Sequence, residues 1–456
     1  MKVTARSGST DLLVTISPTS SVHRWLDDHP RTTGAMLALM IAFAIMHGVW
    51  PQFPAWPSGL AGWLAGMLLW RRISFGQRIQ VAVISGLGLV AVVWGWYRGG
   101  PIDGVKLLYQ NHALLAMLAA VTFLRLVSLP EASQSEDIPR GWPAYLRTLI
   151  GIHFFGAAIN LSAVAIFGDR LAKGDTIDQR TAILISRGFS SVSLWSPFFA
   201  GMAVVLTYSR GAELPVLIAI GMPLAVCGLL FTFAEAVRLD PRRLAEFSGY
   251  PVHFQSLWVP GLLAAGVLLT HGFLPQWSIL TVISLVAPVL TYLILLQRLD
   301  RRRAGAAMRQ HVYTRLPNMS GELLLFLAAG VLAVGLTSVF ASFGDWLPFT
   351  ALTGPTASLT LLVLVALAAI GIHPIISVSA VAASFAPINP DPTLLAMVFL
   401  MTWGIGVASS PLSGTHLLIQ GRFGIEGWRF FRWNLSYCLF LLLLGSVILH
   451  LYVWLT

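Results

Sequence analysis

Long apolar stretches alternate with short polar segments along the whole chain. The stretches are long enough for helices, whereas the strands of a membrane β-barrel are segments of about ten residues with alternating polarity. The pattern predicts membrane-embedded helices at 33–50, 55–71, 78–97, 110–128, 145–170, 181–208, 212–236, 256–273, 277–297, 318–342, 355–386, 393–420 and 430–455. We therefore expect an all-α polytopic membrane protein.

Two of these stretches do not read as simple crossings. The first, 145–170, is interrupted at GAAINLSA, and the second, 355–386, at GIHPIISVSA, where Gly371 and Pro374 break the helix. Irregular backbone at membrane depth is tolerated only inside protein or along a cavity. Each stretch is therefore predicted to form a re-entrant hairpin, which leaves about 11 transmembrane helices plus two re-entrant hairpins.

Arginine clusters give the predicted orientation. They follow the second, seventh, ninth and twelfth stretches, at Arg71, Arg72, Arg78, Arg238, Arg242, Arg243, Arg298, Arg301, Arg302, Arg303, Arg309, Arg422, Arg429 and Arg432. With two hairpins and a cytoplasmic N-terminus, all four clusters lie in the cytoplasm, as the positive-inside rule requires. This predicts a plasma membrane protein, in a bacterium an inner membrane protein, with a cytoplasmic tail at 1–32 and the C-terminus outside.

Two pairs of similar segments suggest an internal duplication. Leu161 to Ala165 matches Val378 to Ala382, and Ser196-Pro197 matches Ser410-Pro411, in the same order and at nearly equal spacing. Chance recurrence of Ala, Val and Ser is the alternative. Because the predicted topology opens the two hairpins to opposite sides, we expect an inverted repeat of 55–245 and 246–456, with 33–54 as an unpaired transmembrane helix.

Composition supports the membrane class and narrows the partners. Of the 456 residues, 56% are hydrophobic and 11% charged, with mean hydropathy +0.76, which exceeds what one soluble core can hide. The net charge of +10 is attributed to topology, so no nucleic-acid partner is expected. Cys227 and Cys438 lie apart in apolar stretches and predict neither a disulfide framework nor a metal site.

The candidate site follows from SSPLSGTH at 409–416, a polar segment inside an apolar stretch. Proline unwinds a membrane helix, and in inverted-repeat transporters the freed backbone groups hold substrate and ions. We expect this segment and WSPFFAGM at 195–202 to face each other across one binding site. The candidate substrate-binding or ion-binding residues are Asn160, Ser162, Ser196, Pro197, His373, Ser377, Ser379, Ser410, Pro411, Ser413 and Thr415.

None of these residues is acidic, so hydroxyls, an amide and helix N-termini favour an anion. Any one serine could instead bond its own helix. His373 could bind an anion as the cation, carry a coupled proton, or stay neutral and bond a carbonyl. Arg187 and His416 are candidate charge-sensing groups; an intramembrane arginine is costly, and a structural pair with Asp169 or Asp175 is favoured slightly over attraction of substrate.

Five stretches resemble a known family: AAINLSAVA (157–165), SLWSPFFAGMAV (193–204), GELLLFLAAGVLAVGL (321–336), IGIHPIISVSAVAA (370–383) and GIGVASSPLSGTHLLIQGRFG (404–424). They are similar to the hairpin tips and unwound helices of the ion-transporter superfamily, which includes divalent-anion/sodium symporters and arsenite permeases. The resemblance implies secondary active transport and a homodimer. Asn160 preserves part of the family's Ser-Asn-Thr-type tip, and the second tip carries His373-Pro374 instead.

The predicted function is transport of a small anion, carboxylate-like or an oxyanion, coupled to H⁺ or Na⁺ and without other cofactors. The expected partners are this anion, the lipid bilayer and a second copy of the chain. A membrane-embedded enzyme acting on a lipid or lipid-linked substrate is the alternative, although the sequence has no HExxH motif. The absence of GxxxxGK[ST] argues against an ATP-driven pump. A channel or scaffold would leave the repeated breaks unexplained.

Overall fold

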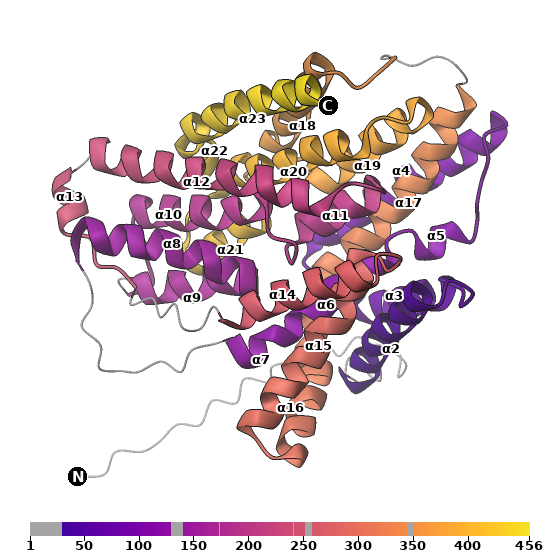
Figure 1. The fold of residues 1–456 in the computed structure, drawn as a ribbon, viewed down its shortest axis with the longest axis horizontal. Helices are drawn as coiled ribbons and strands as arrows, with labels where there is room; N and C mark the ends of the chain where they lie inside the picture. Colours follow the sequence, from indigo (N-terminus) through magenta and orange to yellow (C-terminus); the bar gives the residue numbers. More distant parts are fainter. Residues whose placement is uncertain (1–29, 129–139, 173, 240, 251–257, 344–349) are drawn as a thin grey trace, which may run out of the picture.

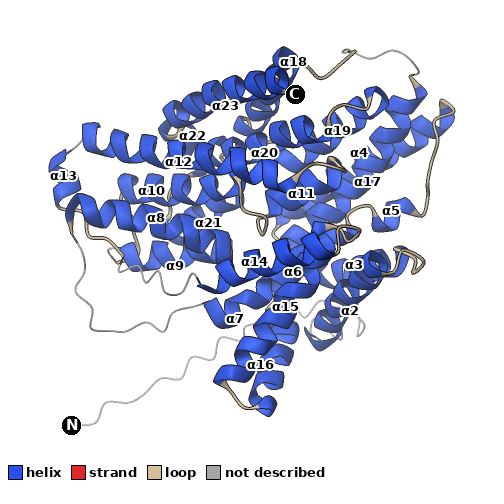
Figure 2. Ribbon diagram, in the orientation of Figure 1, coloured by secondary structure: helices blue, strands red, loops and turns tan. Residues whose placement is uncertain are grey.

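The computed structural model describes residues 30–128, 140–172, 174–239, 241–250, 258–343 and 350–456. Within these ranges every regular element is a helix, and an isolated bridge joins Arg140 to Ser248 (Figure 2). Eight helical stretches are long and apolar enough to cross a membrane, and shorter apolar helices accompany them. The predicted all-helical membrane protein is confirmed. The predicted tail at 1–32 lies outside the described residues except for its last three, which begin the first helix.

The first half of the chain supplies the elements α2 (Pro30–Val49), α3 (Trp56–Leu69), η1 (Trp70–Arg72), α4 (Phe75–Tyr97), α5 (Lys106–Tyr109), α6 (His112–Val121), η2 (Thr122–Leu124), α7 (Arg125–Ser128), α8 (Gly141–Ile159), α9 (Leu161–Leu171), α10 (Gln179–Ser190), η3 (Ser191–Leu194), α11 (Ala200–Tyr208), α12 (Leu214–Leu239) and α13 (Pro241–Ala245). The second half supplies α14 (Trp258–Phe273), α15 (Ile279–Arg298), α16 (Arg301–Thr314), η5 (Leu316–Met319), α17 (Ser320–Ser342), α18 (Gly354–Ala369), α19 (Pro374–Phe385), η6 (Ala386–Ile388), α20 (Pro392–Ser409), α21 (Gly414–Phe423), α22 (Gly427–Trp433) and α23 (Leu435–Leu455).

Side-chain caps determine where several of these helices begin. Ser74 and Gln77 form a capping box at the start of α4, and Asp178 accepts a hydrogen bond from Thr181 N at the start of α10. Asp391 caps α20 in the same way through Leu394 N, at 2.7 Å. Each cap satisfies a backbone N–H that has no partner within its own helix, so the polar residues between apolar stretches set the helix boundaries.

Each stretch predicted to be a hairpin forms a pair of contacting helices, and its re-entrance from one side of the membrane stays a prediction. The first pairs α8 with α9 around Asn160, and the second pairs α18 with α19 around 370–373. In Figure 1 the first hairpin lies at the left and the second at the upper right, on opposite sides of α20. The predicted stretches at 181–208 and 393–420 are broken helices, which form α10, η3 and α11 in one case and α20 and α21 in the other.

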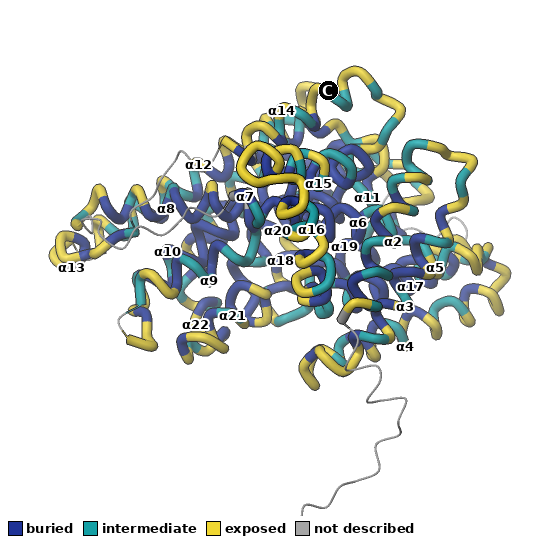
Figure 3. The backbone as a smooth tube through the Cα atoms, turned by 90° about the horizontal axis from the view of Figure 1, so that it is seen from below, coloured by how far each residue is buried: buried dark blue, intermediate teal, exposed yellow. Residues whose placement is uncertain are grey.

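Helix α16 is the main element that the sequence analysis missed, because its arginines were interpreted as a loop. It packs against α2, α15 and η5, with Ala304 and His311 buried on one face. Elsewhere the core runs along the central helices: α10 and α20 are buried over most of their length, whereas α4 is largely exposed (Figure 3). Helices α10 and α20, which precede the two breaks, therefore lie in the interior of the molecule.

Candidate functional site

The two broken helices have the same local geometry. Ser196 N donates to Val192 O and Phe199 N to Ser196 O; in the second half of the chain, Ser410 N donates to Gly406 O and Ser413 N to Ser410 O. The serine hydroxyls also match, since Ser196 Oγ accepts from Phe198 N at 3.4 Å and Ser410 Oγ from Leu412 N at 3.3 Å. The sequence match between these segments therefore corresponds to a repeated backbone turn.

Serine followed by proline explains the turn. Pro197 and Pro411 have no N–H, so the helical hydrogen-bond ladder stops, and each preceding serine side chain supplies a local partner for the next free N–H. The chain then re-enters a helix at Ala200 and at Gly414. Ser196, Pro197, Ser410 and Pro411 are all buried and shape the two breaks, and their predicted role in binding substrate or ions stays a prediction.

The hairpin tips resemble each other less closely. Asn160, at φ 54°, accepts a hydrogen bond from Leu161 N through its side chain, and His373 Nδ1 accepts one from Ile375 N at 3.3 Å. The helices after the two tips begin at Leu161 and at Pro374, so these two positions correspond in the fold. The sequence match had paired Leu161 with Val378 instead, about one helical turn beyond the true tip.

The serines selected in the second hairpin are therefore not at its tip. Ser379 is fully buried and donates to Ile376 O at 2.9 Å, and Ser377 donates to Pro374 O at 3.1 Å. Both hydroxyls bond their own helix, as serines in membrane helices usually do. The expected placement of Ser377 and Ser379 at the tip is wrong, and neither hydroxyl has a hydrogen left for a substrate in this conformation, whereas His373 does lie at the tip.

Both tips contact the second break. Leu161, at the first tip, lies against Gly414: a Cβ on that glycine would be 3.4 Å from Leu161 Cδ1. Gly371, at the second tip, lies against Leu412, with the corresponding distance 3.0 Å. In addition, α9 packs on α21 and α19 on α11, so each hairpin contacts the broken helix of the other half. Segments from the two halves of the chain thus meet at residues 412–414.

The first break contacts the second broken helix one to two turns before its break. A Cβ on Gly404 would lie 2.5 Å from Leu194 Cδ2, and Gly201 packs on the Trp403 ring. The Trp403 ring also contacts the His373 ring edge-on, with centroids 5.6 Å apart. Trp403 therefore connects the first break to the second tip. Direct contact between the two breaks across one site stays a prediction.

His153 on α8 is a polar residue that the sequence analysis overlooked. Its Nε2 accepts a hydrogen bond from Trp195 Nε1 at 3.0 Å, and its Nδ1 lies 2.9 Å from Ser191 Oγ. These contacts join the first hairpin to the first break. The signal in the sequence is a histidine within an apolar stretch, but only the fold brings it to Trp195.

Hydrogen-bond donors remain free at the two tips. Because His373 Nδ1 accepts from Ile375 N, the proton of the neutral ring is on Nε2. Within the described part of the chain, neither this Nε2, nor Asn160 Nδ2, nor the Ser162 hydroxyl has a hydrogen-bond partner, and all three residues are partly exposed. Thr415 and Ser413 are buried, and Ser413 Oγ caps α21 through His416 N. The tips therefore present donors, which suit an anionic ligand.

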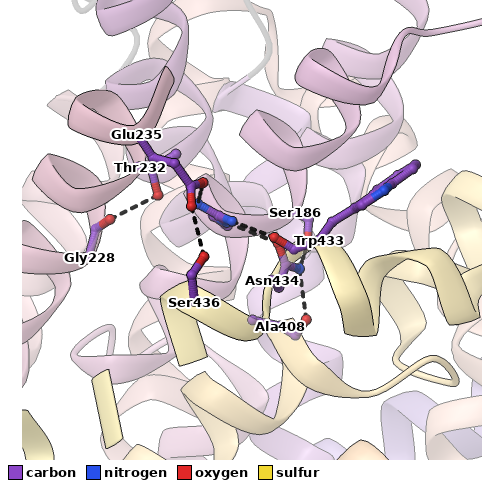
Figure 4. Close-up of polar contacts among 9 residues, drawn as sticks. Ser186, Gly228, Thr232, Glu235, Ala408, Trp433, Asn434 and Ser436 are labelled. Atoms are coloured by element: carbon purple, nitrogen blue, oxygen red, sulfur yellow. Dashed lines mark hydrogen bonds and ion pairs between the residues drawn. The ribbon is translucent and has the colours of Figure 1, made fainter. Parts of the chain in front are cut away.

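Arg187 is the centre of a buried polar network, and its partners Glu235, Trp433 and Asn434 are labelled in Figure 4. Its side chain is 0% exposed and donates to Glu235 Oε2 at 2.5 Å, to Trp433 O at 2.6 Å and to Asn434 Oδ1 at 2.9 Å. The Tyr437 ring lies beneath the guanidinium, 5.1 Å from its central carbon. Each of the three guanidinium nitrogens has a partner, and the side chain is fully buried, so these contacts hold Arg187 inside the protein.

The partner predicted for Arg187 is wrong. Asp169 pairs instead with Arg422, which joins α9 to α21 at the surface. Glu235 is 22% exposed and also accepts from Ser436 Oγ at 2.7 Å. A structural pair was the favoured reading of Arg187, and that part is confirmed with a different carboxylate.

His416 belongs to the same network. Its Nδ1 donates to Ser410 O at 2.7 Å, so its Nε2 accepts from Ser186 Oγ at 2.7 Å; Asn434 Nδ2 in turn donates to Ser186 Oγ and to Ala408 O. The ring also stacks on Phe430, with centroids 4.0 Å apart. Both ring nitrogens are engaged and the residue is 0% exposed, so His416 holds the second break against α10, and its role in charge sensing stays a prediction.

Asn160 gives a direct test of the first tip. Its φ of 54° and ψ of −142° are disfavoured for residues with a Cβ. We expect Asn160→Ala, which keeps the strain and loses the cap, to lower the free energy of unfolding by about 1–3 kcal/mol. Asn160→Gly should cost less, because glycine adopts this conformation freely. Thermal unfolding in detergent measures the difference; equal losses would mean that the backbone at the tip is not strained.

No protein-family profile and no curated protein matches the sequence. Among solved structures, the chain is similar to the YdaH transporter of Alcanivorax borkumensis, with 14% identity over 80% of this chain and 87% of that one and a TM-score of 0.46. Similarity at this level does not establish a shared fold. In the described residues no group of three or more His, Cys, Asp or Glu side chains is placed to hold a metal ion.

Proposed function

We propose that the protein is a secondary active transporter that moves a small anion, carboxylate-like or an oxyanion, coupled to H⁺ or Na⁺. The observation that carries this proposal is the meeting of both hairpin tips at residues 412–414, with free donors on Asn160, Ser162 and His373. Donors without neighbouring carboxylates attract an anion, and the N-terminus of α21 at Gly414 adds a favourable dipole.

Alternating access follows if the two hairpins open to opposite sides. The proposal treats 55–245 and 246–456 as an inverted repeat, with 33–54 unpaired and about eleven crossing helices. The matching turns at the two breaks support a duplication, and the exchange of contacts between α9 and α21 and between α19 and α11 supports a two-fold relation between the halves. Each tip then closes the site from one side of the membrane.

The proposal also includes the setting of the transporter. We place the N-terminus in the cytoplasm and the C-terminus outside a bacterial inner membrane, because that orientation collects the arginine clusters inside. A homodimer is part of the proposal through the family resemblance.

Uptake into proteoliposomes tests the function. We expect the protein to accumulate one member of a panel of radiolabelled carboxylates and oxyanions under an imposed pH or sodium gradient, without ATP. His373→Ala should reduce uptake about tenfold or more, because it removes a donor to a charged group, and Ser410→Ala should reduce it by disturbing the break. Ser342→Ala is the matched control, since this hydroxyl bonds its own helix at the end of α17.

Two results would count against the proposal. Accumulation that is independent of every imposed gradient would indicate a channel. No accumulation of any anion, together with chemical turnover of a lipid in the same vesicles, would favour the membrane-embedded enzyme. Variants at His373 and Ser410 that transport like the parent would show that the substrate binds elsewhere.

A further inference from the structure

A cavity lies between α2, η2 and α15, away from the hairpin tips. Its volume is about 220 Å³, and it is lined by Ala38, Ile41, Ala42, Ile45, Phe123, Ser284, Leu285, Pro288 and Val289. The one hydroxyl in this lining, on Ser284, donates to Leu280 O at 2.7 Å, so it has no hydrogen to offer an occupant. Ala42 and Val289 are exposed, so the cavity opens to the surface, where its apolar lining suits hydrocarbon.

One end of the cavity adjoins a basic cluster. The Phe123 ring, which lines the cavity, packs on the His311 ring of α16 with centroids 4.5 Å apart. His311 Nε2 lies 2.9 Å from Thr122 Oγ1, whose own hydrogen goes to Ala119 O, so the imidazole donates. Arg125 follows Phe123 by two residues at the end of η2, and Arg315 lies about one helical turn after His311 at the end of α16, so both arginines extend from backbone next to this ring contact.

These charges lack a partner in the described part of the chain. No carboxylate there pairs with Arg125 or Arg315, and the acidic residue of α16's N-cap, Asp300, pairs with Arg303 at 3.2 Å. Two neighbouring arginines repel each other unless an anion lies between or beside them. The cluster is therefore complementary to a phosphate group.

The spacing along α2 relates the two features. Gly34 of α2 packs directly on the backbone of α16, since a Cβ there would be 2.3 Å from Val312 O, beside His311. The cavity begins one turn later, at Ala38, and reaches Ile45. With a rise of 1.5 Å per residue, Ile45 lies about 16 Å beyond the crossing. The positive charges thus lie near the start of α2, and the apolar cavity extends from there along the helix. A phospholipid has the matching arrangement, with a charged headgroup at one end and acyl chains extending from it.

We propose that this cavity and the arginines beside it bind one anionic phospholipid, with an acyl chain between α2 and α15 and the phosphate at Arg125 and Arg315. Basic pockets between membrane helices recognise anionic headgroups, and each arginine contributes about a threefold to tenfold gain in binding. Pro288 lies in the part of α15 that lines the cavity. Because proline removes a hydrogen bond within the helix, α15 can bend at this point and leave room for the cavity. The bound lipid would hold α2 and α15 together beside α16.

Binding of tritiated phosphatidylglycerol to the full chain in detergent tests the proposal independently of transport. Phosphatidylglycerol should bind at least about tenfold more tightly than phosphatidylcholine. The double variant Arg125→Gln/Arg315→Gln should weaken phosphatidylglycerol binding about 30-fold and leave phosphatidylcholine binding unchanged. Arg301→Gln/Arg302→Gln is the matched control, since it removes the same charge from the exposed first turn of α16.

A second pair of variants tests the cavity. Ala42→Phe fills it and should weaken phosphatidylglycerol binding about tenfold, by excluding methylene groups. Leu39→Phe, on an exposed position of the same helix outside the lining, should bind like the parent. If Ala42→Phe fails to fold, the arginine variants still test whether the headgroup binds at Arg125 and Arg315.

Three results would overturn the proposal. Equal binding of the two lipids would show that the arginines do not recognise the headgroup. Displacement of the lipid by millimolar inorganic phosphate would indicate a free-anion site without an acyl pocket. A control pair that weakens binding as much as Arg125→Gln/Arg315→Gln would indicate diffuse surface attraction.

Discussion

Glu235→Gln is expected to lower the free energy of unfolding by about 3–5 kcal/mol, the cost of leaving a buried charge without its partner. Arg187 is 0% exposed, and its counterion in the described part of the chain is Glu235. The remaining partners, Trp433 O and Asn434 Oδ1, are neutral and cannot compensate a full charge. Thermal unfolding in detergent, followed by intrinsic fluorescence, measures the loss.

Two further variants make the result specific to the buried pair. Asp300→Asn breaks an exposed ion pair with Arg303, whose side chains are 57% and 79% exposed, and should cost less than about 1 kcal/mol. Arg187→Met/Glu235→Leu removes both charges and should recover part of the stability lost in Glu235→Gln, because no unpaired charge remains. A Glu235→Gln variant as stable as the parent would mean that water reaches Arg187 and solvates it.

The same network holds the second break in place through hydrogen bonds from both halves of the chain. Ser186 and Arg187 belong to the first half of the chain, whereas His416 and Asn434 belong to the second. Their hydrogen bonds fix Ser410 O and Ala408 O, the last carbonyls before the break, against α10. The fold thus divides the polar candidate residues into three groups: those that shape the breaks, those that remain free at the tips, and Ser377 and Ser379, which bond their own helix.

The breaks and hairpins could be predicted from sequence because their causes are local. Serine followed by proline in an apolar stretch stops a helix wherever the chain folds, and Asn160 and Gly371 are residue types that accept turns. The sequence match placed the second tip about one helical turn too far along the chain. Segments made of Ala, Val and Ser can be aligned in several ways, so such a match does not fix the position of a turn. The position of the second tip is determined by the backbone turn at His373, and residue composition alone does not locate that turn.

Contacts between distant segments could not be predicted. Nothing in the sequence distinguishes Glu235 from Asp169 as the partner of Arg187, since the choice depends on how α12 packs against α10. His153 and Trp195 meet for the same reason. Helix α16 was within reach of prediction, because Ala304, Met308 and His311 recur at helical spacing on one face despite the arginines between them.

Gly427→Ala is expected to abolish most transport while Gly421→Ala is tolerated. Gly427, at the start of α22, lies directly on the second break: a Cβ there would be 2.1 Å from Pro411 O, a backbone atom that cannot rotate away. The break must shift, which costs about 1–3 kcal/mol and moves residues 412–414 relative to both hairpin tips. Gly421, on α21, has no other atoms within 4 Å of the corresponding position.

Alanine at Gly421 should even stabilise α21 by about 0.5–1 kcal/mol, because glycine is unfavourable inside a helix. Uptake rate and thermal midpoint, measured on both variants in the same vesicle and detergent preparations, separate displacement of the break from general loss of folding. We expect Gly427→Ala to remain folded with a lower midpoint and a much lower uptake rate. Transport by Gly427→Ala at the parent rate would show that the position of Pro411 does not matter for the site, and the proposed convergence of the tips on residues 412–414 would then have no role in transport.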